Sequence, residues 1–133
     1  MILFKKYEFI IIIFCLLLVV SILYLGLIMI SSRYLTEGIS AFDQGNYDLA
    51  YEKLLKAAKF GSRDIAIDYY IGRVLYEKKD YNNAKKYFNN VIASNIYDSD
   101  HYVFSLYYLG HSNFLIYNFE ESLYNFKNYL FQR

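Results

Sequence analysis

The segment GISAFDQGNYDLA (residues 38–50) recurs as GRVLYEKKDYNNA (residues 72–84). The glycine, the tyrosine and the final alanine each return after 34 residues, and a looser copy, GHSNFLIYNFEES (residues 110–122), follows 38 residues further on. A period of about 34 residues is typical of a helix–turn–helix unit that stacks on copies of itself. The 133-residue chain is therefore predicted to contain an all-α solenoid of three helix pairs.

Each recurring position has a physical role. A glycine inside a helix costs about 1 kcal/mol relative to alanine, so its return in register indicates that two helices touch where a Cβ would not fit. Small residues on the second helix are the expected partners, a large apolar residue one turn later fills the core, and an aromatic residue closes the turn. These positions are Gly38, Gly72 and Gly110; Ala50, Ala84 and Ser122; Leu54, Phe88 and Phe126; and Tyr47, Tyr81 and Phe119.

One turn separates the two helices of each pair. The three turns are Gly45-Asn46, Lys79-Asp80 and Tyr117-Asn118, in which Asn or Asp suits the N-cap of the following helix. The first helices are predicted over residues 31–44, 64–78 and 101–116, and the second over 46–60, 80–93 and 118–131. The repeat units are accordingly placed at about 31–64, 65–98 and 103–133 of a domain that covers 31–133.

This pattern resembles the tetratricopeptide repeat family over nearly all of residues 31–133. The resemblance implies a right-handed solenoid whose first helices line a concave groove, which commonly receives a peptide or helix from another protein. The chain departs from the family pattern in having no proline and no tryptophan. Val91 and Tyr129 also stand where the family has a small residue.

The family pattern, carried over residue by residue, implies a partner-binding groove. Its expected residues are Tyr69, Arg73 and Tyr76 in the second unit and Tyr107, His111 and Phe114 in the third. The alternative is that the tyrosines pack between helices, and that His111 is a partly buried packing residue. The family's two-carboxylate clamp is not expected, because Leu35 and Ile39 stand where it needs Lys and Asn.

A second surface is predicted on the last helix, residues 118–131. Such solenoids usually end in an additional polar helix, because terminal repeats otherwise expose their core. Tyr124 and Phe131 are seven residues apart and therefore share one helical stripe outside the core face. We expect this terminal interface to contact a protein partner or a second copy of the chain.

Before the repeats, residues 9–30 form one apolar run, FIIIIFCLLLVVSILYLGLIMI, without a charge. These 22 residues would span roughly 33 Å as a helix, the thickness of a bilayer's hydrocarbon core. The run is longer than a signal-peptide core and lacks a clean small-x-small cleavage site, which favours an uncleaved transmembrane helix. Cys15, the only cysteine, lies inside the run, so no internal disulfide and no lipoprotein signal are expected.

Orientation follows from the basic residues that flank the run. Lys5 and Lys6 precede it, in residues 1–8, whereas Arg33 alone follows closely. Because basic residues stay on the cytoplasmic side, the N-terminal flank is predicted to lie inside and the repeats outside the cytoplasm. The predicted location is a cytoplasmic (inner) membrane, crossed once, and the alternative is the reversed topology.

Composition excludes several classes of function. Residues 31–133 carry 12 basic and 12 acidic side chains, which argues against a nucleic-acid partner. The cluster Asp98-Ser99-Asp100-His101 precedes an apolar helical run and is interpreted as a helix cap rather than a metal or acid–base site. No metal, cofactor, catalytic residue or small-molecule substrate is expected.

The sequence thus favours a membrane-anchored scaffold or adaptor for protein–protein interaction. An extracytoplasmic bacterial envelope assembly is the preferred setting, and a cytosol-facing membrane adaptor is the alternative. An enzyme is the third class, and it would need a convergent set of polar groups that the sequence does not show.

Overall fold

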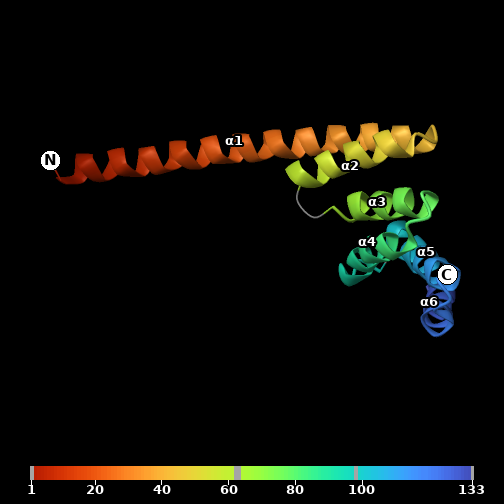
Figure 1. Cartoon of the computed structure of the whole chain (residues 1–133). Coiled ribbons are helices and arrows are strands. Elements are labelled where there is room, and N and C mark those ends of the chain that lie inside the picture. The colour runs from red at the N-terminus through yellow and green to blue at the C-terminus, as the bar shows by residue number, and fades with distance from the viewer. Residues whose placement is uncertain (1, 62–63, 98, 133) are drawn as a thin grey trace.

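The computed structural model describes residues 2–61, 64–97 and 99–132, with side chains from Tyr7 onward. It consists of six helices: α1 (Ile2–Asp43), α2 (Tyr47–Phe60), α3 (Ile65–Glu77), α4 (Tyr81–Ala93), α5 (Asp100–Leu115) and α6 (Phe119–Phe131). In Figure 1, α2 returns along the C-terminal half of α1, and the remaining helices stack below this first pair. No strand occurs among the described residues, and the predicted all-α fold is confirmed.

Helix α1 joins the apolar run to the first repeat. It extends unbroken for 42 residues and passes without a turn from the apolar run, residues 9–30, into the first repeat. By length and composition, its segment Tyr7–Asp43 can cross a membrane, and the most apolar window of that segment is 0% buried. The side chains from Phe9 to Ile30 therefore take no part in the core of the solenoid.

Side chains cap the second helices of the first two pairs. Asn46 Oδ1 accepts a hydrogen bond from the Leu49 amide and Asp80 Oδ1 from the Asn83 amide, each at 3.3 Å. Asn118, at the start of α6, makes no such bond. Before α5, Ser99 Oγ accepts from the His101 amide at 3.2 Å, while Asp98 lies outside the described residues. The third pair therefore starts its second helix without the cap that fixes the other two.

The three turns within pairs share one unusual backbone conformation. Gly45, Lys79 and Tyr117 have φ of 75°, 63° and 63°, all in the left-handed region. Glycine adopts this conformation at little cost, whereas a residue with a Cβ is strained by about 1–2 kcal/mol. The turn between the helices of each pair is therefore the same, but only the first pair has the residue that fits it.

The helices of each pair approach most closely at the recurring glycines. A Cβ on Gly38 would lie 2.8 Å from Leu54 Cγ, one on Gly72 would lie 2.7 Å from Phe88 Cε1, and one on Gly110 would lie 3.0 Å from Phe126 Cδ1. The nearest side chain is thus the large residue one turn after the small one. Ala50 and Ala84 are fully buried, and Ser122 is nearly so, beside these contacts.

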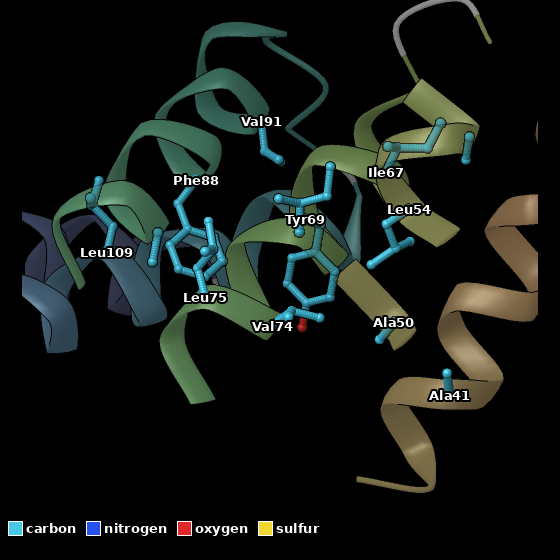
Figure 2. Packing of buried hydrophobic residues seen from close by; sticks show 13 residues of the cluster. Ala41, Ala50, Leu54, Ile67, Tyr69, Val74, Leu75, Phe88, Val91 and Leu109 are labelled. Atoms are coloured by element: carbon cyan, nitrogen blue, oxygen red, sulfur yellow. The ribbon is translucent and has the colours of Figure 1, made fainter. Parts of the chain in front are cut away.

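One apolar core runs through the first two pairs and ends in the third. Figure 2 shows Leu54, Phe88 and Leu109 within it, from α2, α4 and α5. At the positions of Ile67, Val74 and Leu75 in α3, the corresponding residues of α5 are Ser105, Ser112 and Asn113. All three are buried, and their side-chain polar atoms have no hydrogen-bond partner among the described residues. The third pair is therefore the least apolar part of the stack.

The glycine contacts predict a graded response to alanine. Gly72→Ala should destabilise the solenoid by about 1–3 kcal/mol, because the fully buried Phe88 ring cannot move aside. Gly110→Ala should be close to neutral, because its contact is longer, Phe126 is only partly buried, and alanine gains about 1 kcal/mol of helix propensity. Urea unfolding of the detergent-solubilised chain, followed by tyrosine near-ultraviolet circular dichroism, measures both. Equal midpoints for the two variants would contradict the packing described here.

The strained turns predict a stabilising substitution. Lys79→Gly should raise the free energy of unfolding by about 1 kcal/mol, because glycine removes the Cβ that disfavours φ of 63°. The matched control is Lys78→Gly, one residue earlier, where φ is −75° and glycine gains nothing. The same urea titration compares the two variants. Stabilisation by both, or by neither, would show that the left-handed backbone does not strain this turn.

Candidate partner-binding surfaces

Aromatic side chains connect the first helices of the three pairs around Arg73. Its guanidinium carbon lies 4.3 Å from the ring centroid of Tyr108 on α5 and 5.0 Å from that of Phe42 on α1. Nη1 donates to Tyr69 Oη at 3.0 Å, and Nη2 lies 3.8 Å from a carboxylate oxygen of Glu77. Arg73 thus ties together all three units, and its Nε is buried without a hydrogen-bond partner in the described chain.

Tyr69, predicted to line the groove, is 6% exposed and belongs to the core. Its ring packs against Phe88 of α4 and against His101 and Tyr108 of α5. The packing alternative therefore describes this residue, which offers almost no surface to a partner. Its partners on α5 were not identified from the sequence, because they belong to the next unit and no spacing within α3 points to them.

Tyr76 is partly buried and bridges α3 to α5. Its hydroxyl forms a short hydrogen bond with His111 Nδ1, and its ring packs against Tyr108 at 5.1 Å between centroids. Burial raises the pKa of Tyr76 above its ordinary value, with the neighbouring Tyr107 as a further cause. Tyr76 therefore keeps its proton at neutral pH. Its bond to His111 joins α3 to α5, the first helices of the second and third pairs.

The corresponding residues of the third unit are uncovered. Tyr107, His111 and Phe114 stand 38 residues after Tyr69, Arg73 and Tyr76, and Tyr107 and Phe114 are 37% and 51% exposed. The rings form a near-parallel series: Tyr107 and His111 are 6.2 Å apart at 3°, and His111 and Phe114 are 6.4 Å apart at 15°. On the second unit α5 covers these positions, whereas on the third unit the equivalent side chains Tyr107 and Phe114 are exposed.

Helix α6 continues this open surface. Phe119 packs edge-on against Phe114 at 5.6 Å, and Leu123 and Leu130 follow it on the same helical stripe, all three exposed. Their counterparts in α4 include Lys85 and Ile92, which are partly buried within the stack. We call the set of Tyr107, His111, Phe114, Phe119, Leu123 and Leu130 the open end of the solenoid.

The predicted terminal interface lies elsewhere on α6. Tyr124 and Phe131 are exposed, but so are their counterparts Lys86 and Ala93, which the third unit leaves uncovered. Tyr124 lines a pocket with Asn89 of α4 and Asn113 of α5. Binding at Tyr124 and Phe131 therefore stays a prediction, separate from the open end. The exposure of Leu123 and Leu130 could have been inferred from the sequence, because an offset of 38 residues aligns α6 with α4.

The described residues contain no group of three or more His, Cys, Asp or Glu side chains that could hold a metal ion. His101 instead packs edge-on against Tyr69 at 4.8 Å. Across the first pair, Glu37 accepts hydrogen bonds from Lys53 at 2.6 Å and Arg33 at 2.9 Å, and these hold the pKa of its carboxyl below the ordinary value. The contact with Lys53 joins α1 to α2, and the contact with Arg33 lies within α1.

Comparison with known proteins supports the fold. No family model and no curated protein sequence matches this chain. Among solved structures, the chain is similar to the TPR domain of OM64 from Arabidopsis, with a TM-score of 0.75 and 13% sequence identity. The match covers 81% of this chain and 86% of that domain. The architecture is therefore that of a tetratricopeptide helical solenoid.

The position of Arg73 predicts that lysine cannot replace it. Arg73→Lys should lower the free energy of unfolding by about 1–2 kcal/mol, because an ammonium group cannot stack flat between Phe42 and Tyr108. The control is Arg33→Lys, whose side chain is exposed and whose loss should stay within about 0.5 kcal/mol. Chemical unfolding of the solubilised chain provides the comparison. A similar small loss for both would mean that stacking at Arg73 contributes little.

Proposed function

We propose that this protein is a single-pass, membrane-anchored scaffold whose solenoid binds a protein partner at its open end. The observation that carries the proposal is the contrast between Tyr69, which is 6% exposed, and its counterpart Tyr107, which is 37% exposed. The same position is core in one unit and surface in the next. An apolar surface built like an internal repeat boundary is suited to receive another helix.

The proposal of a membrane anchor rests on the exposed apolar half of α1. Between Phe9 and Ile30 nearly every side chain is large, apolar and exposed. Burying one such side chain contributes about 1.5–3 kcal/mol. The free-energy cost of leaving about 20 of them in water therefore exceeds the free energy of unfolding of a small domain several times. A bilayer is a cover of the right thickness for this helix.

We further propose that the N-terminus faces the cytoplasm and that the solenoid lies outside it, at a bacterial envelope assembly. Lys5 and Lys6 precede the apolar run and Arg33 follows it. The Lys5 and Lys6 side chains lie outside the described side chains, so this part of the proposal depends on sequence alone. A cytosol-facing adaptor of reversed topology is the competing arrangement.

The internal boundary between the second and third units indicates the kind of partner. There, α5 covers α3 and α4 with Tyr108 stacked on Phe88 at 5.7 Å and His101 packed against Tyr69. A partner for the open end would offer a comparable amphipathic helix, with ring-bearing residues about one or two turns apart. Such a surface binds and does not catalyse, which is the role we assign to this protein.

Two double variants on α6 separate the possible surfaces. A photo-cross-linking amino acid at Phe114 in the membrane-bound chain should yield an adduct with one protein partner. Leu123→Lys with Leu130→Lys should abolish this adduct, because two charges cannot be buried in an apolar interface. Tyr124→Lys with Phe131→Lys, on the other stripe of the same helix, should leave it unchanged.

The reverse pattern would assign binding to Tyr124 and Phe131 and refute the open end. A matched cross-linker at the exposed Asn82 of α4 controls for random proximity. A topology reporter fused after the last helix tests orientation in the same cells, and activity only in the cytoplasm would establish the reversed arrangement.

A further inference from the structure

The C-terminal end of α2 is held beside the end of the apolar run. Ser31, the first residue after that run, is buried, and its Oγ donates to the Ala57 carbonyl of α2 at 2.9 Å. A Cβ on Gly61 would collide with Ser31 Oγ, so the chain leaves α2 in close contact with α1. Ile28 of the apolar run lines a small pocket of about 100 Å³ together with Gly61 and Asp64.

The C-terminal end of α4 lies on the same side of the solenoid. Both α2 and α4 run back toward the side of the N-terminal half of α1 (Figure 1). Ile96, between α4 and α5, lines a pocket of about 360 Å³ with Ile65, the first residue of α3, and with Ala93 and Ser94. Because Ile65 follows directly on Asp64, the described residues that line these two pockets form one edge, which begins at Ile28.

This edge carries apolar side chains that the solenoid does not bury. Ile96 and Tyr97 are 51% and 50% exposed, and they lie between α4 and α5, in a connection two residues longer than the one between α2 and α3. The turns at the opposite end of the first two pairs, Gln44–Asn46 and Lys78–Asp80, are polar. Ile96 and Tyr97 thus place apolar surface at the end of the stack that lies beside the apolar run.

Charged side chains of both signs lie near this edge. Arg33 follows the apolar run closely and is exposed, and Lys59 lies 5.7 Å from the centroid of the Phe60 ring at the end of α2. A basic side chain near an anionic membrane surface contributes about 1 kcal/mol. The acidic residues described at this edge lie at helix N-termini: Asp64 Oδ1 accepts from the Ala66 amide at 2.9 Å, and Asp68 and Asp100 lie in the first turns of α3 and α5.

We propose that the segment from Ser94 to Tyr97 rests in the interfacial layer of the bilayer that α1 crosses, with Ile96 and Tyr97 at the boundary between headgroups and acyl chains. Tyrosine prefers this depth because its ring is apolar and its hydroxyl stays hydrated. The inference rests on the membrane anchor of the proposed function. It adds a second attachment, through which the solenoid lies against the membrane instead of standing free of it.

The absence of tryptophan from the sequence provides a direct test. Three full-length variants each carry one tryptophan: Tyr24→Trp in the apolar run, Tyr97→Trp in the proposed contact, and Tyr117→Trp in the α5–α6 turn. Each is reconstituted into phosphatidylcholine vesicles with or without bromine on the acyl chains. Tyr117, which is more exposed than Tyr97, is the matched control.

We expect brominated lipid to quench the emission of Tyr24→Trp strongly and that of Tyr97→Trp clearly, with a blue shift for both, while Tyr117→Trp keeps its full emission. Adding Ile96→Ser to Tyr97→Trp should reduce the quenching. If Tyr24→Trp is quenched and Tyr97→Trp behaves like Tyr117→Trp, the second attachment is refuted and the anchor stands. If Tyr24→Trp itself escapes quenching, the membrane anchor of the proposed function fails.

Discussion

The close approach of two helices at a glycine is the constraint on which this structure depends. At Gly38, Gly72 and Gly110 the first helix of each pair meets a large apolar side chain of the second, with no room for a methyl group in the first two. The contact sets the distance between the helices, and with it the place of the turn and the face that the pair presents to its neighbour. Because the same contact recurs, the pairs can stack. The stack then determines which side chains are core and which are surface.

Stacking gives one residue position two different roles. Tyr69 and Tyr107 occupy equivalent places, yet one is enclosed by the next unit and the other is not. Arg73 shows what enclosure achieves, since its guanidinium lies between rings from α1 and α5 and holds three units in register. The third unit has His111 at that position, bonded back to Tyr76. It also has Ser105, Ser112 and Asn113 where the second unit has apolar residues, so the third unit buries polar atoms without hydrogen-bond partners among the described residues.

The helix pairs could be predicted from the sequence, because a glycine, a small residue, an aromatic residue and a turn recur at nearly fixed spacing. The second helices end at Phe60, Ala93 and Phe131, where they were expected to end. The environment of Tyr69 was not predictable from α3, because the rings that cover it come from α5. The left-handed backbone at Lys79 and Tyr117 was hidden because neither residue suggests it. The exposure of Leu123 and Leu130 could have been predicted by aligning α6 with α4. The terminal interface was instead predicted only from the stripe of Tyr124 and Phe131 on α6.

The continuity of α1 has a mechanical consequence. A helix of 42 residues is about 63 Å long, and it has no turn or proline at which bending would concentrate. The half that pairs with α2 is held to it at Ser31 and at Glu37, so the first repeat and the apolar half move as one lever. If that half crosses a bilayer, a change in membrane thickness that tilts the helix swings the distant end of the solenoid through the same angle. Conversely, a pull on a molecule held at that end is delivered to the membrane as torque.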